Sequence, residues 1–166
     1  ISEAFLVLRA QEIGLPVVWI PMVMIVMSAV YSVASYPAGL LGARFGRGAL
    51  LAGSLVALVA AQGALAALSG SLGLWVGAGL WGLHMGLTQG IFASLIADVA
   101  PAEHRGTAFG VFNLMSGVAL LIASVLAGWL WDQHGPAWAF WMGAGLSLLT
   151  LVLLPFARGP IREVRS

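Results

Sequence analysis

The feature that most constrains this chain is the length of its uncharged stretches. Residues Gly48 to Ala97 hold no Asp, Glu, Lys or Arg, and neither do Ile13 to Ala43. A membrane-spanning helix needs roughly 20 apolar residues to cross a hydrocarbon core about 30 Å thick. Both stretches reach that length, and the longer one has room for two crossings. Because 61% of the residues are hydrophobic, the chain also lacks the polar surface that a water-soluble domain needs.

Turn residues and charges divide the sequence into five predicted spans. Ser69 to Gly73 is the only cluster of turn-forming residues near the middle of the longest stretch. The stretches lack the alternation of strands and are too long for barrel strands, so only helices can satisfy their backbone in lipid. We predict an all-α, polytopic transmembrane helical bundle over residues 1–157 and a basic cytoplasmic tail over residues 158–166. The predicted spans are about 16–42, 49–68, 74–97, 107–131 and 137–156.

The arginines are distributed unequally between the two ends of the predicted helices. Threading the spans in order leaves Arg9 alone at one end, with the remaining arginines at the other. The positive-inside rule makes the arginine-rich end cytoplasmic, so we expect an inner (plasma) membrane protein of bacterial type with a cytoplasmic C-terminus. Taken by themselves, two loop arginines most often anchor a turn to lipid headgroups. The arginine-rich end holds Arg44, Arg47, Arg105, Arg158, Arg162 and Arg165.

The loop after the first predicted span has the sequence GLLGARFGRG, from Gly39 to Gly48. It resembles the Gly-x-x-x-Asp-Arg-x-Gly-Arg-Arg/Lys signature that major facilitator superfamily transporters carry after the second helix of each half. Ala43 replaces the aspartate of this signature, and Gly48 replaces its final basic residue. The positions that match are Gly39, Arg44, Gly46 and Arg47.

A second stretch, DVAPAEHRGTAFG from Asp98 to Gly110, resembles the family's cytoplasmic connection between its tenth and eleventh helices. Together the two matches imply a partial C-terminal six-helix half, with helices eight to twelve and the end of helix seven. Members of the family bind substrate between two six-helix bundles that alternate in access. The implied partners are the lipid bilayer, a missing N-terminal half and an unknown small-molecule substrate. A transporter gene would then encode about six or seven further spans upstream.

The resemblance also implies a role for these loops as a cytoplasmic gate. We expect Gly39 to let helices approach closely and Gly46 to supply the backbone angle of the turn. The loop arginines can pair with a carboxylate at a helix end, and such pairing is thought to latch the gate in the family. The loss of aspartate at Ala43 predicts a weakened or rewired latch. The predicted gate residues are Gly39, Arg44, Gly46, Arg47, Asp98, Arg105 and Gly106, with Glu103 as a second candidate carboxylate.

Polar residues inside the spans are the candidates for a transport path, because such residues are costly in lipid. His84 is the one titratable group near the middle of a span, and Thr88 shares its helix face with Gln89 adjacent. His84 either hydrogen-bonds to a neighbouring helix or lines a cavity, and a proton-coupling role is a third, weaker reading. The predicted cavity-lining residues are Tyr31, Ser32, His84, Thr88, Gln89 and Asn113.

Other polar and small residues in the spans have simpler interpretations. The serines are expected to hydrogen-bond to their own helices. Gln62 and Thr150 are the most polar members of two spans that we expect to be supporting helices facing lipid. Gly82, Gly86 and Gly90 recur at every fourth position, which favours close packing of another helix.

The sequence gives no support to an enzyme, a metal site or a nucleic-acid interface. There are no cysteines, the three histidines belong to different regions, and no nucleophile and base are spaced to meet. A basic face for nucleic acid is absent as well. We therefore predict no catalytic residue, cofactor or metal. The predicted function is transport of a small molecule as part of a secondary transporter, and the alternative is a non-transporting structural or assembly module in the membrane.

Overall fold

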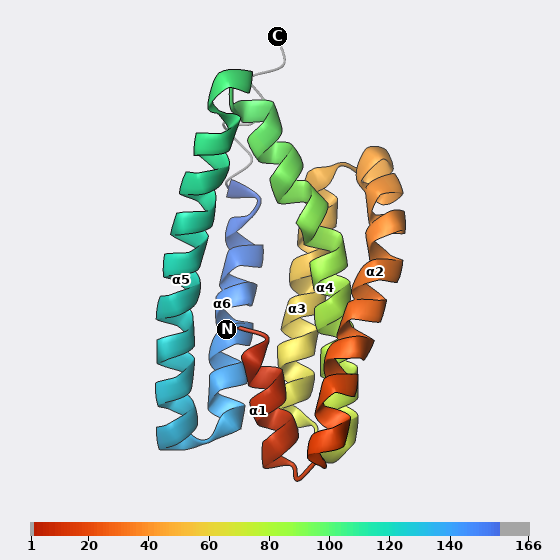
Figure 1. Ribbon diagram of the computed structural model, residues 1–166, viewed down its shortest axis with the longest axis vertical. Helices are drawn as coiled ribbons and strands as arrows, with labels where there is room; N and C mark the ends of the chain where they lie inside the picture. Colours follow the sequence, from red (N-terminus) through yellow and green to blue (C-terminus); the bar gives the residue numbers. More distant parts are fainter. Residues whose placement is uncertain (1, 157–166) are drawn as a thin grey trace.

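The computed structural model describes residues 2–156, apart from the side chains of residues 43, 90 and 93–99. This part of the chain forms a bundle of helices and contains no strand (Figure 1). Each predicted span falls on one long helix, so the all-α fold class is confirmed. The helices are α1 (Ala4–Glu12), α2 (Ile20–Phe45), α3 (Arg47–Ala67), α4 (Gly70–Val99), α5 (Arg105–His134) and α6 (Pro136–Leu153), with short 3-10 turns at Val17–Trp19 and Ala102–His104.

Four segments in the described part are long and apolar enough to cross a membrane. They are Val17–Gly42, Arg47–Ala67, Ala102–His134 and Pro136–Leu153. The 30-residue helix α4 lies between the second and third of them in the chain. At about 1.5 Å per residue, each of these helices reaches or comes close to the thickness of a hydrocarbon core. The division of the chain at residue 157 into bundle and tail remains a prediction, because residues 157–166 lie outside the described part.

Single glycines join two pairs of consecutive helices. Gly46 separates α2 from α3 and has φ of +84°, while Gly135 separates α5 from α6 and has φ of +94°. A side chain would be strained at these angles, and glycine adopts them freely. The sequence therefore reverses direction within one residue at each site. The expectation that Gly46 supplies the angle of its turn is confirmed.

The alternation of the helices places the loops at two opposite ends of the bundle. In Figure 1 the α2–α3 turn and the α4–α5 connection lie toward one end, and the α3–α4 and α5–α6 turns lie at the other. Arg44, Arg47 and Arg105 consequently belong to the same end, as the threading of the spans predicts. The tail arginines lie outside the described residues.

The helices do not pack equally against one another. Helix α4 packs extensively against α2 and α3, and α3 packs against α6 on its other side. Helix α5 packs mainly on α6 and makes few contacts with α4. Its Leu114 and Met115 are each 68% exposed. The bundle therefore has a tight part around α3 and α4, and a loosely held helix, α5, beside it.

Close approach of α2 and α4 depends on glycines of α4. A Cβ atom added to Gly82 would overlap the carbonyl group of Met27, and one added to Gly86 would lie 2.7 Å from the Cβ of Ala34. The packing role predicted for the repeated glycines is confirmed at these two positions, while the third, Gly90, lies outside the described side chains. The same role predicted for Gly39 is wrong, because a Cβ atom there would meet nothing within 4 Å.

Candidate functional site

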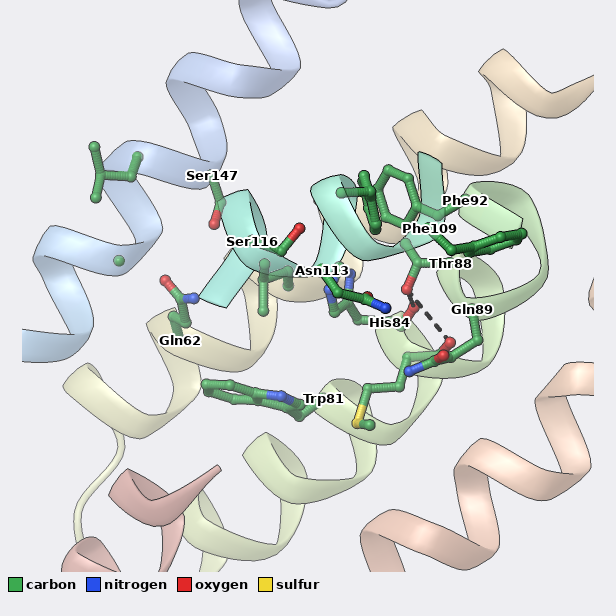
Figure 2. A pocket seen from close by; sticks show the side chains of 15 residues that line it. Gln62, Trp81, His84, Thr88, Gln89, Phe92, Phe109, Asn113, Ser116 and Ser147 are labelled. Atoms are coloured by element: carbon green, nitrogen blue, oxygen red, sulfur yellow. Dashed lines mark hydrogen bonds between the residues drawn. The ribbon is translucent and has the colours of Figure 1, made fainter. Parts of the chain in front are cut away.

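A cavity lined by both polar and apolar side chains lies between helices α3, α4, α5 and α6 (Figure 2). Its volume is about 570 Å³. It lies where α4 and α5 make few contacts with each other. The residues around it are Leu58 and Gln62 from α3; Trp81, His84, Met85, Thr88, Gln89 and Phe92 from α4; Phe109, Phe112, Asn113 and Ser116 from α5; and Gly143, Leu146 and Ser147 from α6.

His84 combines the two interpretations that the sequence left open. Its Nδ1 atom lies 2.9 Å from the carbonyl oxygen of Ser54 on α3, and its ring also lines the cavity. A carbonyl oxygen can only accept, so Nδ1 carries the proton of this hydrogen bond. In the neutral ring Nε2 is then left as an acceptor. His84 is thus held by a neighbouring helix and also borders the cavity.

The four predicted cavity residues His84, Thr88, Gln89 and Asn113 lie around this one space. The Thr88 hydroxyl donates to the carbonyl oxygen of His84 at 2.8 Å, which is a bond within α4. Asn113 faces the site from α5, on the opposite wall from Gln89 (Figure 2). The structure therefore brings these residues together, and their role in binding stays a prediction.

Tyr31 belongs to a second space, between α2, α3 and α4. This second cavity has a volume of about 500 Å³, and Gln89 borders both cavities. Ser32 lies on the exposed face of α2 and lines neither of them. The six predicted residues are therefore not a single site. The second cavity is bordered by Tyr31, Ser35, Ala38, Gly39, Gly42, Arg47, Leu50, Gly86, Leu87, Gln89 and Ile91.

The predicted gate residues lie toward the ends of four helices, α2, α3, α4 and α5. Arg44 is exposed at the end of α2 and stacks over the ring of Phe45, with its guanidinium carbon 5.3 Å from the ring centroid. Arg47 begins α3 and also borders the second cavity. Arg105 begins α5 and is followed by Gly106, which has open space around it. The side chain of Asp98 lies outside the described residues, so its pairing with an arginine stays a prediction.

Several hydroxyl groups inside the helices are satisfied locally. Ser35, Ser54 and Thr150 each donate to a carbonyl oxygen one turn earlier, at 2.7 to 2.9 Å. This confirms the expected back-bonding for these residues. Ser147 differs, because it is only 8% exposed and makes no such bond within the described structure.

Gln62 is the clearest position at which the prediction from the sequence is wrong. It was expected on a face turned to lipid, yet it is only 4% exposed and borders the cavity from α3. Its Oε1 atom is the one buried side-chain polar atom without a hydrogen-bond partner among the described residues. A lone glutamine in the otherwise apolar sequence of α3 was the available signal, because polar side chains at membrane depth tend to face the protein interior.

Comparison with known proteins agrees with this architecture. The family model of the Major Facilitator Superfamily matches residues 4–165. An uncharacterized MFS-type transporter of Methanocaldococcus jannaschii is 30% identical over 162 residues, which cover 93% of this chain and 40% of the relative. One from Mycobacterium tuberculosis is 33% identical over 117 residues, 70% of this chain and 17% of the relative. A probable 4-methylmuconolactone transporter of Cupriavidus pinatubonensis is 30% identical over 129 residues, 75% of this chain and 30% of the relative.

The chain thus spans less than half the length of each of these relatives. All three relatives are named as transporters. No solved structure gives a significant match to the chain. The long apolar helices and the family match over residues 4–165 together make this an integral membrane protein that belongs to the major facilitator superfamily.

Proposed function

We propose that this chain supplies most of the C-terminal half of a secondary transporter that moves a small molecule by alternating access. The observation that carries the proposal is the cavity of about 570 Å³ between α3, α4, α5 and α6. Ligand sites in proteins typically have volumes of 300 to 1,000 Å³, aromatic walls and a few placed polar groups. Trp81, Phe92 and Phe112 supply such walls here, and His84, Gln89 and Asn113 supply the polar groups.

The loose contact of α5 with α4 supports a moving part beside this cavity. The rings of Phe92 and Phe112 meet across the two helices with centroids 5.6 Å apart. Apart from this pair, few residues hold α5 to α4, whereas α3 and α4 pack extensively. Alternating access in transporters of this kind proceeds by rocking of one bundle against another around a central site. A displacement of α5 would open or narrow the cavity while α3 and α4 keep their arrangement.

The proposal assigns the remaining half of the path to partners of this chain. A missing N-terminal half would pack on this bundle, and the lipid bilayer would cover the other apolar faces. Exposed apolar side chains of α2 and α5, such as Val33 at 75% and Leu121 at 64%, are the surfaces to be covered. The family match and the partial coverage of the relatives support this assignment.

We place the arginine-rich end on the cytoplasmic side of a bacterial inner membrane, with the C-terminal tail on the same side. There Arg44 and Arg47 would act as gate elements that pair with a carboxylate such as Asp98 or Glu103 in one state of the cycle. Neutralising Arg47 should shift the ratio of inward-open to outward-open molecules, measured by distances between spin labels in the full-length protein. An unchanged ratio would exclude the latch.

Transport itself is tested by reconstituting the full-length protein in liposomes and measuring uptake of a panel of small molecules. Asn113→Leu and Gln89→Leu should each reduce uptake of an accepted compound, because each removes a polar group from the cavity wall. The matched control is Thr150→Val on α6, whose exposed hydroxyl bonds only to the carbonyl oxygen of Leu146. A full-length protein that moves no compound of the panel would favour the alternative, a non-transporting structural or assembly module.

A further inference from the structure

The side chain of Gln62, on the wall of the cavity, carries a buried amide oxygen that has no hydrogen-bond donor. The Oε1 atom of Gln62 is fully shielded from solvent, and the whole residue is 4% exposed. Burying an amide oxygen without a hydrogen bond is unfavourable, and such groups are rare in native proteins. An unpartnered buried acceptor on a cavity wall therefore indicates that something else supplies the donor. No group in the described structure supplies that donor, and Gln62 borders the cavity, so a ligand there is the available source once the amide turns its oxygen toward it.

Ser147 presents a hydroxyl group without a hydrogen bond on the wall of the same cavity. It is 8% exposed, lies on α6, and its hydroxyl makes no hydrogen bond within the described structure. Figure 2 shows the Ser147 hydroxyl and the Gln62 amide pointing toward one another from α6 and α3. A serine in a helix normally back-bonds to its own helix, as Ser54 does. The hydroxyl of Ser147 is instead available to a ligand as either donor or acceptor.

The charge of the cavity limits what can bind between these two residues. No Asp, Glu, Lys or Arg is among the described residues that line it. A carboxylate or phosphate would find no counter-charge there, and neither would an ammonium group, so the desolvation of a charged group would be uncompensated. An uncharged donor such as a hydroxyl has no such desolvation penalty of a charge. The walls nearby are apolar and aromatic, with Trp81 and Leu58 among them.

We propose that Gln62 and Ser147 form a hydrogen-bonding subsite for an uncharged hydroxyl on a hydrophobic substrate. The substrate hydroxyl donates to Oε1 of Gln62 and exchanges a hydrogen bond with the Ser147 hydroxyl, while its apolar body lies against the aromatic wall. This inference names the chemical class of the transported molecule, and it therefore rests on the proposed transport function. It assigns ligand recognition to α3 and α6, the helices that the sequence indicated as mere supports.

The test compares naphthol with its methyl ether, because the two differ in one hydroxyl donor. Equilibrium binding of each compound is measured on the full-length protein in lipid nanodiscs, for wild type, Gln62→Leu and Ser147→Ala. The readout is the ratio of the two dissociation constants, ether over naphthol, which cancels most effects of partitioning into lipid. Thr150→Val on α6 is the matched control, because it removes an exposed hydroxyl that is already satisfied.

We expect the ratio to fall roughly three- to tenfold in Gln62→Leu and in Ser147→Ala, which is the range expected for one neutral hydrogen bond. The control should keep the wild-type ratio. Gln62→Leu should fold at least as stably as wild type, because leucine replaces an unsatisfied amide. Because the two variants lie on different helices, one variant still tests the subsite if the other folds poorly.

An unchanged ratio in both variants would overturn the subsite, and so would a wild-type protein that binds neither compound. Uptake of both compounds into liposomes is measured in parallel. If the ratio changes as expected but neither compound crosses the membrane, the subsite stands and the transport function fails. If the compounds cross with a ratio insensitive to Gln62 and Ser147, transport stands and the subsite fails.

Discussion

Gly82 on α4 lies directly against the carbonyl group of Met27 on α2, with no space for a side chain between them. Helix packing within membranes depends on such small residues, because lipid offers no hydrophobic force to press the helices together. This contact is one reason why α2 and α4 lie so close along their length.

Gly82→Ala should therefore destabilise the protein. The added Cβ atom would overlap backbone, which cannot rotate away, and overpacking of this kind costs about 1 to 3 kcal/mol. That loss outweighs the gain of up to about 1 kcal/mol in helix propensity. Gly79→Ala is the control, because a Cβ atom there meets nothing within 4 Å. Thermal unfolding of the full-length protein in detergent would contradict the packing role if both variants unfolded at the same temperature.

His84→Leu should lower stability by about 0.5 to 1.5 kcal/mol, the usual net contribution of one hydrogen bond. The substitution removes the link from Nδ1 to the carbonyl oxygen of Ser54, which joins α4 to α3 over 2.9 Å. Thr88→Val on the same helix deletes only a bond within α4 and should have a smaller effect. Chemical unfolding monitored by tryptophan fluorescence measures both. Equal stability of the two variants would mean that the interhelical bond contributes nothing.

Gly46→Ala should cost about 1 to 3 kcal/mol, because φ of +84° with ψ of 154° is a backbone conformation that is essentially restricted to glycine. Gly39→Ala, within the last two turns of α2, should be neutral or slightly stabilising, since nothing lies within 4 Å of its added Cβ atom. Unfolding temperatures of the two variants check this. A larger loss for Gly39→Ala than for Gly46→Ala would show that glycine is required by packing at the helix and not by the turn.

The arrangement of loops at two ends predicts which positions share an aqueous phase. The chain has no cysteine, so single cysteines can be placed at will in this part of the protein. Ala49→Cys and Ala102→Cys should react with an impermeant thiol reagent from the same side of the membrane, and Leu68→Cys from the opposite side. Labelling of Ala49→Cys and Ala102→Cys from opposite sides would refute the topology.

The sequence predicts the helices well and the orientation of their faces poorly. Uncharged length and turn residues locate all five long helices, and the glycine at position 46 marks its turn, because these features act locally along the chain. Gln62 and Gly39 were misassigned for a different reason. In lipid both the packed and the outer faces of a helix are apolar, so hydrophobic periodicity does not reveal how the helix is rotated. Only the tertiary packing shows that Gln62 faces inward and that Gly39 meets no neighbour.

The same limit applied to His84. Its position near midspan marked it as unusual, but the choice between a bond to α3 and a place in the cavity depended on where Ser54 lies. The two residues are 30 positions apart in the chain. No local sequence pattern connects them, and their hydrogen bond depends on the packing of α3 against α4.

The one-residue links at Gly46 and Gly135 have a mechanical consequence. A longer loop could absorb a shift of one helix by changing its own shape, whereas a single glycine has no slack to take up. A displacement of the end of α2 is therefore passed directly to the start of α3, and a displacement of the end of α5 to the start of α6. Because α3 and α6 also pack on each other, displacements that begin on opposite flanks of the bundle converge on the pair of helices that carry Gln62 and Ser147.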